Sequence, residues 1–141
     1  EGGRALVDTT YVDNAVGALV AALDAVSPGA ACSGRAYVVA NGEPRTIREL
    51  VAGICAAADV PFAPRDVSLR AGIAAGALVE RAWPLLRRSD EPPLTRFLAE
   101  QLGTAHWFDP RPAREDLGWA PDVTIDEGLR RLADWFDGAA S

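Results

Sequence analysis

The sequence contains no lysine, because all 14 of its basic residues are arginine. Within these 141 residues the absence excludes Schiff-base chemistry, a phosphate-loop lysine and a Tyr-x-x-x-Lys catalytic pair. Methionine is absent as well, and the chain opens on Glu1-Gly2-Gly3-Arg4. We therefore expect the sequence to be a piece of a longer protein, although N-terminal processing gives the same start.

Cysteine and positive charge are also scarce. Only Cys32 and Cys55 are present, without a pairing pattern or a nearby histidine, so we expect no disulfide framework, no zinc site and a cytoplasmic location. The net charge of -6 excludes nucleic acid and anionic lipid as main partners, because the field of the protein repels both. The longest apolar run, residues 71–79, is far shorter than the ~18 residues of a membrane span. These features predict one soluble domain.

The first half of the chain alternates strand and helix signals. Residues 5–11 are rich in β-forming residues and predict a strand, and Asp13 is a good N-cap for the helix that follows. The apolar residues of that helix share one face: Val16, Leu19, Val20 and Leu23. Residues 36–40 are nearly all apolar, as in a strand covered on both faces, and Thr46 with Glu49 forms a capping box for a second helix. Because no partner strand follows, the missing strands would come from outside the chain.

Turn and capping residues divide the second half into short elements. They predict a strand over 65–69, a helix over 71–88 that Pro84 bends or ends, a helix over 94–102 and an extended segment over 105–108. Asp109-Pro110 then supplies an N-cap and a first-turn proline, and Gly118 a left-handed C-cap. Thr124 and Glu127 make a capping box for a last helix, which carries Ile125, Leu129, Leu132, Ala133 and Phe136.

Few side chains could carry chemistry. The sequence has no strand-borne Gly-x-Gly-x-x-Gly, Gly-x-Ser-x-Gly, His-x-x-x-His or Cys-x-x-Cys. His106 is the one obvious general acid or base, but beside Trp107 and Phe108 it is more typical of a pocket wall or a structural donor. Arg96 follows Pro92-Pro93 and either clamps a carboxylate, phosphate or carbonyl oxygen or lies on a solvated helix face.

Acidic and aromatic residues favour structural roles. Asp8, Asp13 and Asp109 could form a carboxylate cluster, but two of them are better explained as helix N-caps. The four tryptophans are widely spaced, and we expect most of them in the core: Trp83, Trp107, Trp119 and Trp135. We therefore assign no catalytic, cofactor-binding or metal-binding residue.

Several motifs occur in an order that is similar to one protein family. They are YVDN at 11–14, GRAYVVANGEP at 34–44, the helix start at 46–50, Phe108-Asp109, LGWAP at 117–121 and DEGL at 126–129. Across essentially the whole chain they resemble the C-terminal part of extended short-chain dehydrogenase/reductases, the NAD-dependent epimerase/dehydratase family. The stretch 91–97, followed by 104–109, is most similar to the 3β-hydroxysteroid dehydrogenase-like subgroup, which includes reductases of long-chain 3-keto acids.

The resemblance implies an α/β fold, the C-terminal portion of an extended Rossmann-type fold, built as a mostly helical lobe with a few short strands. Residues 1–141 would be the substrate-binding region, with Tyr11 and Asn14 at the cleft and Arg96, His106 and Trp107 toward the substrate. Since side chains of an extended segment alternate, His106 should share a face with Phe108 and not with Trp107. We favour His106 and Arg96 as polar positioning groups and Trp107 as packing.

The implied function is substrate binding in an NAD(P)-dependent oxidoreductase that acts on an apolar hydroxy or keto substrate, either sterol-like or a long-chain 3-keto acid. In this family an N-terminal Rossmann half binds NAD or NADP and carries the catalytic residues, so we expect this chain alone to be inactive. That half could lie on the same or a separate chain. The alternative is a stand-alone, non-catalytic binding or assembly module. Apolar stretches at 36–40 and 71–86 predict pairing with that half or self-association as a homo-oligomer.

Overall fold

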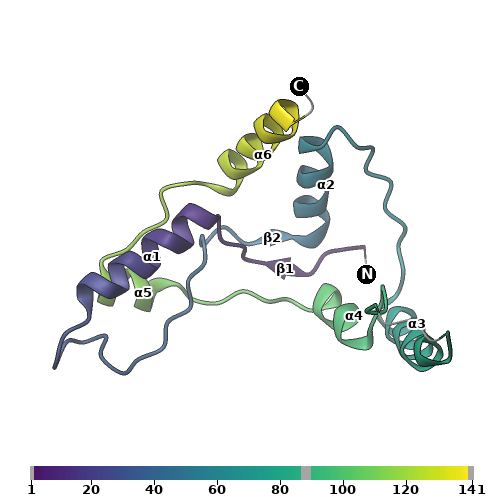
Figure 1. Ribbon diagram of the computed structural model, residues 1–141, viewed down its shortest axis with the longest axis horizontal. Helices are drawn as coiled ribbons and strands as arrows, with labels where there is room; N and C mark the ends of the chain where they lie inside the picture. The colour runs from purple at the N-terminus through teal and green to yellow at the C-terminus, as the bar shows by residue number, and fades with distance from the viewer. Residues whose placement is uncertain (1, 87–89, 140–141) are drawn as a thin grey trace.

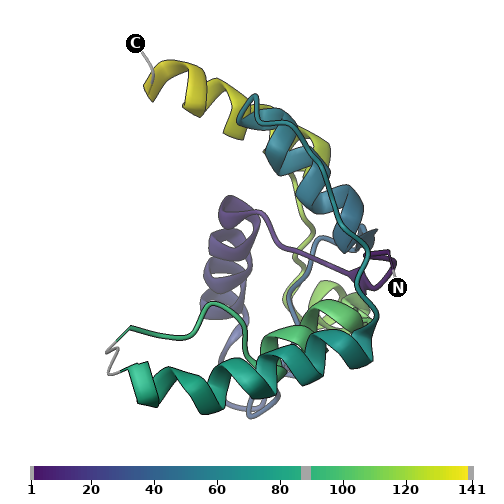
Figure 2. The same ribbon diagram turned by 90° about the vertical axis from the view of Figure 1, so that its right-hand side faces the viewer.

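The computed structural model describes residues 2–86 and 90–139, which are mostly helical (Figure 1). In chain order the elements are β1 (Leu6–Val7), α1 (Val12–Ala25), β2 (Arg45–Thr46), α2 (Ile47–Ala57), α3 (Leu69–Ala82), the 3-10 helix η1 (Trp83–Leu86), α4 (Arg96–Gly103), α5 (Arg111–Leu117) and α6 (Ile125–Ala139). The helices pack in pairs, α1 with α5, α2 with α6 and α3 with α4, around a small central sheet (Figure 2). The predicted α/β class, mostly helical with a few short strands, is confirmed.

The sheet joins three distant parts of the chain. Strands β1 and β2 are antiparallel, with Leu6 opposite Thr46 and Val7 opposite Arg45. Val7 also forms a parallel bridge to His106. The His106 N–H donates to the Leu6 carbonyl at 2.7 Å, and the Asp8 N–H donates to the His106 carbonyl at 3.3 Å. The segment 105–108, predicted as extended, is therefore anchored along β1.

Three predicted strands are shortened or absent. Strand β1 covers two of the residues 5–11, and the segments 36–40 and 65–69 contain no strand. A strand needs a hydrogen-bonded neighbouring strand. Within the described residues the segment 36–40 has no such neighbour, and one backbone bond forms just after it, from the Asn41 N–H to the Thr9 carbonyl at 3.3 Å. The segment 65–69 is mostly exposed and runs directly into α3. The prediction for 36–40 failed because apolar, β-branched composition does not supply a partner strand, and the prediction for 65–69 failed because its last residue, Leu69, begins α3.

Two predicted N-caps lie slightly off their helices. The N-cap of α1 is Tyr11, and Asp13 lies in the first turn instead. The N-cap of α5 is Pro110, while the Asp109 carboxylate accepts the first backbone N–H of the helix at 3.0 Å. Both carboxylates still favour their helices, because negative charge is stabilised near a helix N-terminus. The left-handed C-cap at Gly118 is confirmed by its φ of 65°.

One of the two capping boxes is complete. At α2 the Thr46 hydroxyl accepts the Glu49 N–H, and the Glu49 carboxylate accepts the Thr46 N–H, which lowers the pKa of Glu49. At α6 the Thr124 hydroxyl accepts the Glu127 N–H at 3.2 Å, but the Glu127 carboxylate binds two arginines one turn further along. The second box is therefore half formed, because ion pairing competes for the carboxylate.

The long helix predicted over 71–88 is divided. Helix α3 ends at Ala82, and Pro84 lies in η1, so proline ends the α-helical pattern as expected. Residues 87–88 of the prediction lie outside the described residues. Helix α4 begins two residues after its predicted start at Leu94, because the Thr95 hydroxyl caps it by accepting the Leu98 N–H.

Gly76 of α3 lies close to the backbone at the start of α4. An added Cβ at Gly76 would lie 2.6 Å from the Thr95 carbonyl carbon and 2.7 Å from the Arg96 nitrogen. We expect Gly76→Ala to destabilise the chain by about 1–3 kcal/mol, because these backbone atoms cannot move aside easily. Gly72→Ala is the matched control, since its Cβ would meet only the Ala99 Cβ at 3.6 Å. Alanine's higher helix propensity should make that variant up to about 1 kcal/mol more stable. Chemical denaturation measures both, and equal shifts would contradict the prediction.

The buried core is small and leaves one face of α1 open. Ala18 of α1 packs with Ala113 and Trp119 to form a buried cluster. The large apolar residues of α1 point away from this cluster, with exposed fractions from 51% at Val20 to 73% at Leu23. The exposed set is Val12, Val16, Leu19, Val20, Leu23 and, just beyond the helix, Val26. The small face of α1 is therefore the packed one.

Candidate functional site

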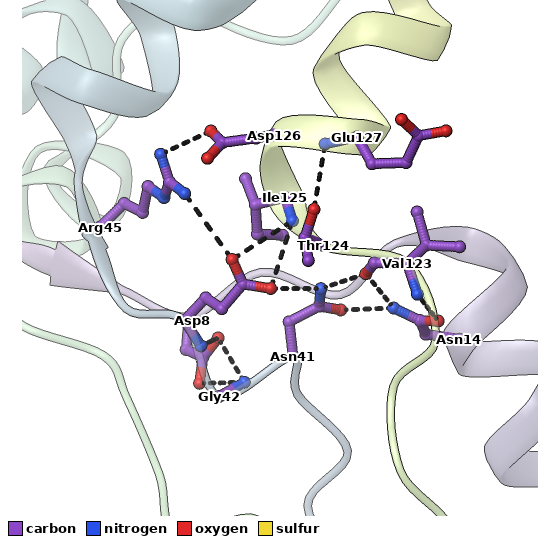
Figure 3. A network of polar contacts seen from close by, with 11 residues as sticks. Asp8, Asn14, Asn41, Gly42, Arg45, Val123, Thr124, Ile125, Asp126 and Glu127 are labelled. Carbon is purple, nitrogen blue, oxygen red and sulfur yellow. Dashed lines mark hydrogen bonds and ion pairs between the residues drawn. The ribbon is translucent and has the colours of Figure 1, made fainter.

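Two buried asparagines connect the beginning, middle and end of the chain (Figure 3). Asn14 Nδ2 donates to Asn41 Oδ1 at 2.9 Å and to the Val123 carbonyl at 2.7 Å. Asn14 Oδ1 accepts the N–H groups of Asp122 and Val123, both at 3.0 Å. Asn41 adds a bond from its Nδ2 to the Val123 carbonyl at 2.8 Å and accepts the Tyr11 N–H at 3.1 Å. We call these two side chains the asparagine junction; they fix the start of α1 against the segment that enters α6.

Carboxylates extend the asparagine junction toward the sheet (Figure 3). The Asp8 carboxylate accepts the N–H groups of Gly42 at 3.0 Å and Glu43 at 3.2 Å. The Glu43 carboxylate accepts the first N–H of α6 at 3.3 Å. Arg45 pairs with Asp126 at 2.8 Å, and this bond lowers the pKa of the Asp126 carboxyl. Since each of these carboxylates binds groups of the chain itself, their arrangement is that of a structural clamp.

Asn14 and Tyr11 have different surroundings, although the sequence placed both at the cleft. An amide side chain offers two donors and two acceptor sites, and the asparagine junction uses all four at Asn14, which is 3% exposed. The Tyr11 ring instead lies against Gly128 of α6, and the Arg131 guanidinium stands 5.5 Å from the ring centre. Of these two residues, Tyr11 is the one that lines a hollow at the surface.

His106 lines a hollow between the sheet and α4. This His106 hollow has a volume of about 450 Å³ and is lined by Val7, Asp8, Val38, Val39, Ala40, Ile47, Gln101, Leu102, His106 and Phe108. As alternation predicted, His106 and Phe108 share this wall, and Trp107 is not part of it. The His106 Nε2 lies 2.7 Å from the Thr104 hydroxyl oxygen, which fixes the ring. The hollow is largely apolar, with few polar side chains.

Arg96 lies apart from that hollow. Its Nε donates to a Glu80 carboxylate oxygen at 2.9 Å, and its backbone N–H donates to the other oxygen at 2.8 Å. These bonds from Arg96 lower the pKa of Glu80. Trp107 is also outside the hollow and is 56% exposed. Neither Arg96 nor Trp107 therefore lines the same hollow as His106.

Tyr11 lines a second hollow, between α2 and α6. This Tyr11 hollow measures about 400 Å³ and is lined by Thr9, Thr10, Tyr11, Val12, Leu50, Ile54, Ile125, Gly128, Leu129 and Leu132. It shares no lining residue with the His106 hollow. The five expected site residues thus lie in separate places. His106 and Tyr11 line different hollows, and Asn14 is part of the asparagine junction. Arg96 and Trp107 lie on the exposed surface of α4 and of the segment after it.

Gln101 is the polar residue that sequence analysis missed. It lines the His106 hollow from α4 and is half-buried. Its position next to Leu102 in a short amphipathic helix was the available signal. The tryptophan prediction was wrong in part, because Trp119 is buried whereas Trp107 and Trp135 are exposed.

The carboxylate of Glu127 makes the stability of α6 depend on pH. Its bonds from Arg130 and then Arg131 lower its pKa from 4.5 to about 2. A carboxyl whose pKa falls on folding stabilises the folded state above its unfolded pKa and loses that contribution as the pH drops. We expect the free energy of unfolding to decrease between pH 4.5 and about 2, and to decrease less in Glu127→Gln. Urea denaturation at several pH values measures both; identical pH profiles would contradict the prediction.

The described residues contain neither a candidate metal site nor a helix that could span a membrane. Residues 2–86 and 90–139 contain no group of three or more His, Cys, Asp or Glu side chains that could hold a metal ion. None of the helices in these ranges is both long and apolar enough to cross a membrane.

Comparison with known proteins identifies relatives of the chain. The 2-alkyl-3-oxoalkanoate reductase of Stenotrophomonas maltophilia is 54% identical over 130 residues, which cover 92% of this chain and 39% of the relative. The enzyme of the same name from Shewanella oneidensis is 40% identical over 90% of this chain and 33% of its own length. The mouse sterol-4-alpha-carboxylate 3-dehydrogenase, decarboxylating, is 28% identical over 95% of this chain and 38% of its own length. No family model and no solved structure matches.

These relatives are oxidoreductases named for 3-oxoalkanoate or sterol substrates. The chain spans only 33–39% of the length of the three. Its similarity to them nevertheless extends over at least 90% of its own residues. The resemblance seen in the sequence motifs is therefore confirmed: this chain is homologous to the C-terminal part of extended short-chain dehydrogenase/reductases of the 3β-hydroxysteroid dehydrogenase-like subgroup.

Proposed function

We propose that residues 1–141 form the substrate-binding region of a cytoplasmic NAD(P)-dependent oxidoreductase. Its substrate is an apolar keto or hydroxy compound, either a long-chain 3-keto acid or a sterol-like molecule. Hydride transfer belongs to a dinucleotide-binding half on the same or a separate chain. The names of the relatives, two for 3-oxoalkanoates and one for a sterol carboxylate, support this substrate class.

The observation that carries the proposal is the His106 hollow. Its volume of about 450 Å³ is within the range of small-molecule sites, roughly 300–1,000 Å³. Such sites combine apolar walls with a few polar groups that fix orientation. The walls of the His106 hollow are mostly aliphatic. Among its polar side chains, Asp8 belongs to the structural clamp, whereas His106 and Gln101 do not. We assign both as positioning groups for the oxygen-bearing end of the substrate.

The described residues do not fit a dinucleotide. A pyrophosphate is held by a glycine-rich turn between a strand and a helix. The connection from β1 to α1 contains no glycine between residues 8 and 11, and β2 runs directly into α2. We therefore assign NAD or NADP to the other half.

The exposed face of α1 supports the presence of that other half. Six large apolar side chains between Val12 and Val26 are each more than half exposed. An apolar patch of this kind marks a missing partner surface. We propose that the dinucleotide-binding half covers this face. Without it, the chain is expected to self-associate.

The test uses the complete reductase, meaning this chain together with its dinucleotide-binding half. We expect His106→Ala to raise KM for a long-chain 3-oxo acid about tenfold, which corresponds to roughly 1.4 kcal/mol for one lost polar contact. The Kd for NADPH should stay unchanged. Gln101→Ala tests the second proposed positioning residue in the same way, with the exposed Arg70→Ala on α3 as control. Loss of NADPH affinity with a normal KM would place His106 on the wrong side of the cleft.

A further inference from the structure

Two smaller hollows lie beside α4. The loop hollow measures about 300 Å³ and lies between the start of α2 and the segment 62–67, and Arg48 and Phe62 are two of its lining residues. The helix hollow measures about 260 Å³ and lies between α3 and α4, and Leu69 and Leu94 are two of its lining residues. Small-molecule sites measure roughly 300–1,000 Å³, so the helix hollow is too small to hold such a ligand by itself. It is suited to extending a larger neighbouring site.

Leu102 separates the His106 hollow from both of these spaces. Among the described residues it is the one that lines all three hollows, and the His106 hollow and the helix hollow share no other described lining residue. The His106 hollow and the loop hollow also share Ile47, at the start of α2. A side chain that lines two neighbouring spaces is part of the wall between them. Leu102 therefore closes the His106 hollow on the side of α4.

Of the two spaces behind Leu102, the helix hollow is better suited to an alkyl chain. Arg4 is the one charged residue among its described lining residues, and the rest of its wall is mostly aliphatic. The loop hollow contains an ion pair, because Arg48 Nη2 donates to a carboxylate oxygen of Asp66 at 2.5 Å. An alkyl chain placed there would displace water from charged groups, which is unfavourable. The helix hollow is therefore the better continuation of the His106 hollow.

The helix hollow also lies on the side where the far end of the substrate is expected. In the proposed function, hydride transfer belongs to the dinucleotide-binding half, so the oxygen-bearing end of the substrate has to face that half. The exposed face of α1 is the surface which that half is proposed to cover. Figure 1 shows α1 and the α3–α4 pair toward opposite ends of the longest axis. An alkyl chain that leaves the oxygen-bearing end is thus directed away from α1 and toward α4.

We propose that Leu102 determines the length of the alkyl chain that the substrate site accepts. The proposal rests on the proposed function and adds a specificity-determining residue to it. A chain that fits the His106 hollow ends against the Leu102 side chain. A longer chain enters the helix hollow only when this side chain is shortened. Leu102 is 45% exposed, so it can be replaced without opening a cavity in the core.

The test measures the Kd of unbranched 3-hydroxy acids, from 3-hydroxyoctanoic to 3-hydroxyhexadecanoic acid, on the complete reductase. Each methylene that becomes buried should strengthen binding about fourfold until the chain reaches Leu102, and further methylenes should add little. We expect Leu102→Ala to extend this rise to longer acids, so that 3-hydroxyhexadecanoic acid binds about tenfold more tightly than it does to the unmodified reductase. Leu102→Trp should end the rise at shorter acids.

A matched control and two double variants complete the test. Leu98→Ala makes the same change one turn earlier on α4, at a 39% exposed position that lines none of the three hollows, so it should leave the Kd series unchanged. Leu94→Trp fills the helix hollow, so in combination with Leu102→Ala it should restore the original length limit. Phe62→Trp fills the loop hollow instead and should not restore that limit.

An unchanged Kd series in both Leu102→Ala and Leu102→Trp would overturn the length-determining role of Leu102 and leave the proposed function intact. Restoration of the limit by Phe62→Trp instead of Leu94→Trp would overturn the route into the helix hollow. Failure of the unmodified reductase to bind any of the acids would overturn the proposed function as well.

Discussion

Replacing Asn14 by alanine is expected to destabilise the chain by about 3 kcal/mol or more. The change removes four hydrogen bonds and leaves the Val123 N–H, the Val123 carbonyl and Asn41 Oδ1 with fewer partners inside the protein. A buried polar group that loses its partner costs about 1–3 kcal/mol, and Asn14 serves several such groups at once. An effect above about 4 kcal/mol would be exceptional for one substitution and would indicate that the segment entering α6 detaches.

Urea denaturation of the unmodified chain, Asn14→Ala and Asp24→Ala measures this effect. Asp24 is an exposed residue of the same helix, so its replacement should change the free energy of unfolding by less than about 0.5 kcal/mol. Comparable shifts in both variants would show that the asparagine junction contributes little.

The isolated chain is expected to bind neither NADH nor NADPH and to reduce no ketone. The physical reason is the missing strand-to-helix glycine turn together with the absence of lysine from all 141 residues. Fluorescence titration with each dinucleotide measures binding, and absorbance of the reduced cofactor measures turnover with a long-chain 3-oxo acid. Saturable micromolar binding, or turnover that requires the chain, would contradict the assignment of dinucleotide binding and hydride transfer to the other half.

Local features of the fold could be predicted from the sequence. The Thr46 capping box, the left-handed Gly118 and the end of α3 before Pro84 each depend on contacts within a few residues. The strands could not be predicted in the same way, because β1 depends on partners that lie far along the chain, at β2 and at His106. Residues 36–40 have the composition of a strand, but composition does not provide a neighbouring ladder.

The candidate site could be predicted where one segment decides the geometry. Alternation along an extended segment placed His106 and Phe108 on one wall and Trp107 elsewhere. The surroundings of Asn14 depend on groups 27 and 109 positions away, which no local pattern indicates. The surroundings of Arg96 could not be predicted for the same reason, since its partner Glu80 lies on another helix, 16 positions earlier.

The most direct test of the central claim places this chain in one of its relatives. In the Stenotrophomonas maltophilia reductase, the matching 130 residues would be replaced by this chain, which is 54% identical there. If the chain is the substrate-binding region, the chimera should have the same affinity for NADH and NADPH as the parent reductase has and should reduce a long-chain 2-alkyl-3-oxo acid. His106→Ala in the chimera should then raise KM without changing the Kd of either dinucleotide. A folded chimera whose dinucleotide affinity equals that of the parent but which neither binds nor reduces the 3-oxo acid would contradict the account.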